Sequence, residues 1–134
     1  MNLNLLLNRY IGIKYVSKGT DFNGVDCYGL CKLFYKNEFQ KDLPDYSEHY
    51  QDAENSNEAT ATVNYGIKEW KEVDKDEPEL GDIIVFKILG LPTHVGIYLT
   101  DNEFLHCLPG RNSVIETLKS VTWNKRVQGI YRYE

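Results

Sequence analysis

The sequence has no run of 18 apolar residues, no even set of cysteines and no excess of basic residues. Without such an apolar run, no segment is predicted to span a membrane. Three cysteines are an odd number, which argues against a disulfide framework and favours free thiols. The 15 basic residues are scattered among 20 acidic ones, and the net charge of −5 argues against nucleic-acid binding.

The beginning of the chain also lacks the basic segment and the small-residue cleavage site of a signal peptide. Instead, Leu3, Leu6, Leu7 and Tyr10 recur at the spacing of one helix face, which predicts a short helix. We therefore expect the protein to be made in the cytoplasm without an export signal.

What the sequence does contain predicts one α+β domain over residues 1–134. The length is that of a single domain. Helical patterns come first, and a series of apolar, strand-like segments follows from residue 82. We expect N-terminal helices packed on an antiparallel sheet of about five strands. These strands are predicted at 82–88, 94–99, 103–108, 113–118 and 128–133, with a turn at 100–102.

Residues 45–80 form a polar stretch with weak helical spacing, which predicts an insertion with one or two surface helices. His49, in this stretch, is expected on the surface. The acidic run at its end (Asp74, Asp76, Glu77 and Glu79) has no metal-ligand spacing and is expected to be solvated.

Cys27 stands out because it follows a loop rich in Gly, Asp and Asn and opens a predicted helix. That helix is expected to end near residues 38–41, and Asp26 is a suitable N-cap residue. The positive end of a helix favours a thiolate. The Asp26 carboxylate opposes this effect, so a nearby imidazole is needed to activate the sulfur.

His94 and His106 are the candidate imidazoles. His94 begins one predicted strand and His106 lies in the next. If Gly96 pairs with His106, the two histidines fall on the same face of the sheet as diagonal neighbours. Cys27, His94 and His106 would then supply a nucleophile, a base and an orienting group.

Other uses of the cysteines are possible from the residues alone. A lone cysteine commonly acts as a small buried hydrophobe, and this is the expected role of Cys31 and Cys107. Cys27, Cys31, His94 and His106 have ligand types suited to zinc. However, the two cysteines are four positions apart on a helical stripe, unlike the tight turns that hold metal cysteines. We therefore expect neither a metal nor another cofactor.

Four segments, "GVDCYGL", "ELGDIIVF", "THVGIYL" and "EFLHCL", resemble the motifs of the NlpC-type cell-wall peptidases, a papain-like group. The resemblance covers most of residues 10–108 and implies a papain-like fold. It also implies that Cys27 is the nucleophile, His94 the base and His106 the third member. Family members keep a tyrosine twelve residues before the cysteine that helps the oxyanion hole, and Tyr15 stands there.

By this resemblance the protein hydrolyses peptidoglycan stem peptides, with a preference for the γ-D-glutamyl–diamino acid bond. The missing export signal, "RYIGIKYV", "LPDY" and the long stretch between Cys27 and His94 resemble a branch found among tailed-phage proteins. That branch implies phage tail-tip partners and a location in the virion tail, or delivery to the periplasm or cell wall. The alternatives are an amidase at the sugar–peptide link, an acyltransferase with the same triad, and a non-catalytic tail assembly component.

Overall fold

The computed structural model describes residues 3–46 and 55–134. The helices are α1 (Leu3–Asn8), α2 (Cys27–Phe34), the π-helical turn η1 (Tyr35–Phe39) and α3 (Ser56–Ile67). The strands are β1 (Thr20–Asp21), β2 (Gly24–Val25), β3 (Lys71–Val73), β4 (Ile83–Ile88), β5 (Leu91–Tyr98), β6 (Glu103–His106), β7 (Val114–Thr117) and β8 (Val127–Arg132). No helix in these two ranges has both the length and the apolar character needed to cross a bilayer.

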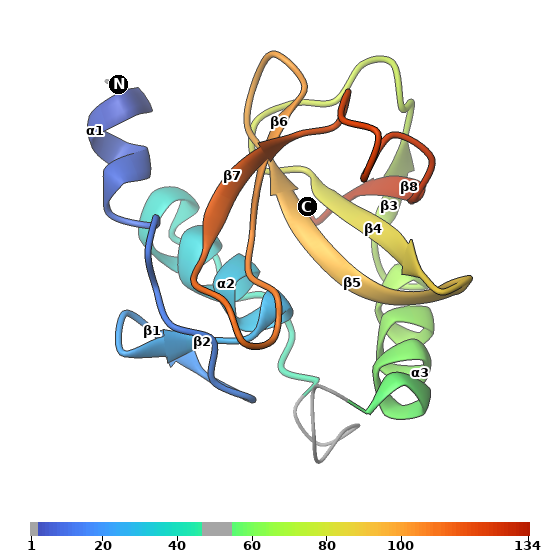
Figure 1. Ribbon diagram of the computed structural model, residues 1–134, viewed down its shortest axis with the longest axis horizontal. Helices are drawn as coiled ribbons and strands as arrows, with labels where there is room; N and C mark the ends of the chain where they lie inside the picture. The colour runs from blue at the N-terminus through green and yellow to red at the C-terminus, as the bar shows by residue number, and fades with distance from the viewer. Residues whose placement is uncertain (1–2, 47–54) are drawn as a thin grey trace.

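The main sheet has six antiparallel strands in the order β3-β8-β4-β5-β6-β7. Helices α2 and α3 both contact β5, and they lie in different parts of the molecule (Figure 1). The α+β class, the antiparallel sheet and all five expected strands are confirmed. The expected count of about five is low by one, because β3 pairs with β8 at the edge of the sheet.

The polar stretch at 45–80 contains one described helix, α3, and the short strand β3. The sequence did not predict β3, since its first two residues are exposed and carry no apolar alternation. The acidic residues of the run at 74–79 are exposed, as expected. His49 and the rest of 47–54 lie outside the described residues.

The two faces of the sheet carry separate apolar clusters. The first cluster packs α2 against one face of the sheet and includes Phe34, Val85, Val95 and Leu105. The second cluster lies on the opposite face. It contains Ile84, Phe86, Tyr98, Phe104, Trp123 and Ile130. Strand β5 therefore lies between the two apolar clusters, and its side chains point alternately into one cluster and the other.

The start of α2 is fixed by close packing as well as by a cap. The Asp26 carboxylate accepts hydrogen bonds from the backbone N–H of Gly29 at 2.7 Å and of Lys18 at 2.8 Å. A Cβ atom on Gly29 would lie 1.8 Å from the carbonyl oxygen of Gly19. The preceding loop therefore leaves no room for a side chain at Gly29, two residues after Cys27. This close contact holds the first turn of α2 in place.

The far end of this helix also agrees with the sequence. After η1, Gln40 adopts a left-handed conformation with φ of 51° and ends the helical segment. This position lies within the predicted end at residues 38–41. The π-helical turn itself was not predicted, because nothing in the local pattern distinguishes it from an α-helix.

An ion pair joins the beginning of β4 to the last strand. Asp82 is buried, and its two carboxylate oxygens accept hydrogen bonds from Arg132 at 2.8 and 2.9 Å. Arg132 also contacts Glu79 at 2.7 Å. The "GD" segment before β4 therefore has a structural role in holding β8 beside β4.

Candidate active site

Cys27 is the first residue of α2 and is half-buried. The backbone N–H groups of Val95 and Tyr28 point towards its sulfur and lower the pKa of the thiol. Val95 directly follows His94 on β5, so the sulfur lies one residue along the strand from the position of the predicted base. The contact joins two segments that are far apart in the sequence.

Burial dominates the electrostatics of this thiol. It raises the pKa of Cys27 to about 12, and the neighbouring Asp26 carboxylate acts in the same direction. The two backbone N–H groups oppose these effects without overcoming them. Cys27 is therefore a neutral thiol at rest, and a base must take its proton as the sulfur attacks.

His94 and His106 meet as the sequence predicted. The Nε2 atom of His94 lies 2.8 Å from the Nδ1 atom of His106. Strands β5 and β6 pair Ile97 with Leu105 and Tyr98 with Phe104. This register continues to Gly96 opposite His106, which is the predicted arrangement and puts both imidazoles on the same face.

Glu116 extends this pair, and the sequence interpretation missed it. Its Oε2 atom lies 2.5 Å from the Nε2 atom of His106. Phe104 pairs with Glu116 across β6 and β7, which makes Glu116 the diagonal neighbour of His106. The alternation of the segment at 113–118 was the available signal, since it puts Val114 and Glu116 on one face and the core residue Ile115 on the other.

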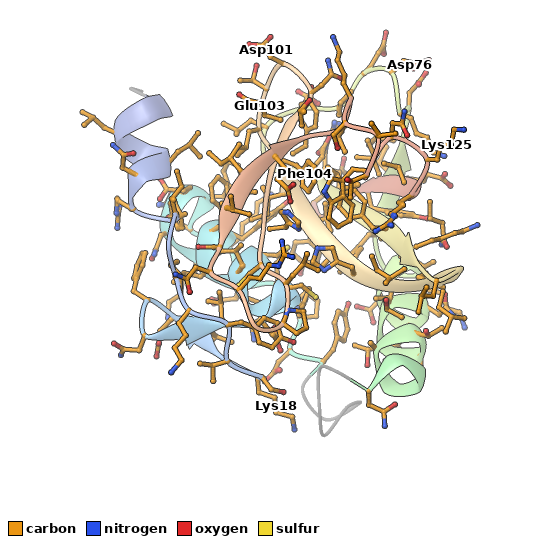
Figure 2. The ribbon with its side chains drawn as sticks, in the orientation of Figure 1. Lys18, Asp76, Asp101, Glu103, Phe104 and Lys125 are labelled. Atoms are coloured by element: carbon orange, nitrogen blue, oxygen red, sulfur yellow. The ribbon has the colours of Figure 1, made fainter. Side chains whose placement is uncertain are left out.

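Aromatic rings enclose the two imidazoles. The Trp123 ring centroid lies 5.0 Å from that of His106 and 5.9 Å from that of His94. Phe86 and Phe104 pack against the same pair. Figure 2 shows Phe104 in the middle of the molecule, well inside the rim that carries Asp101 and Glu103.

This enclosure favours neutral imidazoles. Burial lowers the pKa of His94 to about 3, and the neighbouring His106 adds to the effect. Burial also lowers the pKa of His106, although the Glu116 carboxylate opposes it and Arg111 acts in the same direction as burial. A neutral His94 is a proton acceptor, which is the state that a general base requires.

Cys27 and the histidines approach β5 from different sides. Cys27 packs against the cluster that contains Val95, whereas the imidazoles pack with Phe86 and Trp123 on the other face. The structure thus brings the two histidines into direct contact and brings Cys27 to the backbone beside His94. The link between the sulfur and the imidazole is part of the proposal below.

The remaining predicted residues have clear positions. Tyr15 packs against the same cluster as Cys27, and its backbone forms a bridge with Val25, two residues before Cys27. Cys31 and Cys107 are fully buried in that cluster, which confirms the core role expected for both. Cys107 also lies on the sheet face opposite His106.

No group of three or more His, Cys, Asp or Glu side chains in residues 3–46 and 55–134 is arranged to hold a metal ion. A small pocket that opens to solvent lies beside Cys27. Its walls come from the start of α2, from Thr93 and Val95 of β5, from α3 and from the aromatic residues Tyr46 and Trp70. Part of the stretch at 45–80 therefore forms a wall of the space next to the sulfur.

The NlpC/P60 family profile matches residues 12–132 of this chain. The probable endopeptidase NlpC of Escherichia coli (strain K12) is 31% identical over 127 residues, which cover 92% of this chain and 71% of that protein. The murein DD-endopeptidase MepS/murein LD-carboxypeptidase of the same strain is 24% identical over 115 residues, covering 86% of this chain. This chain spans 53% of the length of that protein.

A solved structure supports the same assignment of the fold. The crystal structure of an NLP/P60-family protein, similar to a lipoprotein, from Staphylococcus aureus subsp. aureus Mu50 superposes with a TM-score of 0.65 and 26% identity. The match covers 97% of this chain and 39% of that chain.

Proposed function

Because the chain belongs to the NlpC/P60 family, we propose that it is a cysteine endopeptidase that hydrolyses peptidoglycan stem peptides. The proposed triad is Cys27, His94 and His106. The observation that carries it is the meeting of Cys27 with β5 at Val95, beside the hydrogen-bonded pair of His94 and His106. Relatives named as murein endopeptidases support the substrate class.

In the proposed first step, the Nδ1 atom of His94 takes the thiol proton while the Cys27 sulfur attacks the peptide carbonyl carbon. The neutral thiol and the neutral imidazole described above are the protonation states from which this transfer starts. The negative charge moves to the carbonyl oxygen. The backbone N–H of Cys27 and the Tyr15 hydroxyl stabilise it, and losing one such donor typically costs about 2.7–4 kcal/mol of barrier.

In the second step, His94 returns the proton to the leaving amine as the carbon–nitrogen bond breaks, which leaves an acyl group on Cys27. A water molecule then attacks this thioester with His94 again as the base, and the free thiol is restored. His106 orients the His94 ring and stabilises its charge when it becomes an imidazolium. Each proton that His94 accepts is returned within the cycle.

The proposed bond is the γ-D-glutamyl–diamino acid bond, and the proposed setting is a phage tail. The preference for the bond and the phage setting both follow from the resemblance of the sequence motifs. In this setting the protein is made in the host cytoplasm and reaches the wall with the tail-tip proteins. Phage particles that carry Cys27→Ala test the setting, since they should assemble normally but infect a thick-walled host poorly.

Digestion of purified cell wall tests the proposed activity. The new amino termini are identified by mass spectrometry after incubation with the protein. A newly exposed diamino acid terminus is expected, whereas a free L-alanine terminus at the sugar link would identify an amidase. Intact wall after prolonged incubation would contradict both the endopeptidase and the amidase functions, and it would favour a non-catalytic assembly role.

A further inference from the structure

We propose that Glu116 is a positioning residue whose carboxylate sets the tautomers of both histidines, so that the Nδ1 atom of His94 is the proton acceptor. This inference rests on the proposed function and extends it beyond the triad. It depends on two contacts that join three strands. His94 on β5 contacts His106 on β6 at 2.8 Å, and His106 contacts Glu116 on β7 at 2.5 Å.

The direction of the hydrogen bonds follows from the chemistry of the groups. An ionised carboxylate only accepts hydrogen bonds, so the Nε2 atom of His106 must carry the hydrogen that lies towards Glu116. In a neutral imidazole, the other nitrogen then has a lone pair. The Nδ1 atom of His106 is therefore an acceptor, and the Nε2 atom of His94 must be the donor.

This arrangement decides which atom of His94 is basic. Because its Nε2 atom carries a hydrogen, its Nδ1 atom has the free lone pair. Without Glu116, either nitrogen of His106 can carry the hydrogen. In the opposite tautomer, the Nδ1 atom of His106 donates to His94, which puts the hydrogen of His94 on Nδ1 and blocks the base. Such a tautomer error is costly in related triads, where the loss in kcat reaches about 10⁴-fold.

The surroundings allow Glu116 to have this effect. Its side chain is 37% exposed, so the carboxylate keeps contact with water, whereas the His106 side chain is fully buried. Besides Glu116, the charged or titratable groups acting on His106 are His94 and Arg111. The rings of Phe104 and Trp123 cover the rest of the imidazole and offer it no competing acceptor.

Glu116→Ala and Glu116→Gln separate the two effects of the carboxylate, its charge and its acceptor oxygen. Glu103→Gln is the matched control, because Glu103 is an exposed carboxylate on the adjacent strand at the rim of the molecule (Figure 2). In each protein labelled with ¹⁵N-histidine, the ring nitrogen shifts report which nitrogen carries the hydrogen. The chain has three histidines, and His49 serves as an internal reference.

At pH 7 the wild type and Glu103→Gln should show hydrogen on Nε2 of both His94 and His106. Glu116→Ala should show mixed tautomers and a kcat about 10- to 100-fold lower, with KM changed less than about twofold. Glu116→Gln keeps an acceptor oxygen without the charge and should give an intermediate kcat. Wild-type tautomers and wild-type kcat in Glu116→Ala would overturn the proposal. If no form cleaves the wall, the proposed peptidase function fails, and the nitrogen shifts alone decide the role of Glu116.

Discussion

The imidazole of His94 contacts the imidazole of His106 at 2.8 Å, within an enclosure formed by Trp123 and two phenylalanines. Two buried imidazoles side by side cannot both be charged without a large cost, and burial disfavours the charge on each. The pair is therefore neutral at rest. His94 is therefore a neutral general base that accepts a proton during the reaction, and it is not the cation of a preformed ion pair with Cys27.

The pH dependence of kcat/KM should reflect this neutral resting state. Burial lowers the pKa of His94 to about 3 from its ordinary 6.5, so the base stays unprotonated as the pH falls below 6.5. The raised pKa of Cys27 keeps its thiol protonated above pH 8. We expect kcat/KM for a soluble stem peptide to be level from about pH 5.5 to 8.5. An acid limb centred at 6.5 or above would contradict this expectation.

Opening the aromatic enclosure should move the acid limb upwards. Trp123→Ala lets water reach both imidazoles, so their pKa values return towards 6.5 and activity declines at higher pH than in the wild type. The large truncation costs about 3–5 kcal/mol in stability. Trp123→Phe keeps an apolar cover and is the control, with an acid limb close to that of the wild type. The same acid limb in both variants would show that Trp123 does not shield the histidines.

The negative charge of Asp26 should lower the rate at which the Cys27 thiol is alkylated. The carboxylate raises the pKa of the thiol, so Asp26→Asn lowers it and increases the thiolate fraction at pH 8. Alkylation of Cys27 by iodoacetamide should therefore be faster in Asp26→Asn, measured by mass spectrometry of the modified peptide. The control is Asp21→Asn in the exposed strand β1. Equal rates in the two variants would rule out this effect of the charge.

Stability should depend on the buried ion pair and little on an exposed one. Arg132→Ala leaves the Asp82 carboxylate buried without its partner and should cost about 3 kcal/mol in the free energy of unfolding. Lys71→Ala removes the exposed contact of Lys71 with Glu134 and should cost less than about 1 kcal/mol. Urea unfolding measures both values. Similar losses in the two variants would contradict the structural role assigned to Asp82.

Much of the fold was predictable because the strands from residue 82 onwards have clear apolar patterns. Their alternation also limited the register of β5 and β6 to one parity, and the pairing of Gly96 with His106 was one register of that parity. Strand β3 was not predictable, because its exposed residues gain their order from pairing with β8 rather than from their own pattern.

The site was predictable in part for the same reason. The spacing of His94 and His106 across one hairpin allowed their contact to be predicted on the condition that Gly96 pairs with His106. Glu116 was missed because its meeting with His106 depends on the register of β6 and β7, which are joined by a longer connection. The neutral state of the thiol was not predictable either. It depends on burial by segments far away in the sequence, and the helix N-terminus alone suggests the opposite.

The most direct test of the account compares two thiols on one helix. Cys27 and Cys31 lie one turn apart on α2, and Cys31 is buried with its thiol donating to the Cys27 carbonyl oxygen at 3.5 Å. The measurement is the rate at which new diamino acid termini are released from purified wall. Cys27→Ala should release none, and Cys31→Ala should keep activity within about threefold while losing about 1–2 kcal/mol of stability. Release by Cys27→Ala at the wild-type rate would contradict the account.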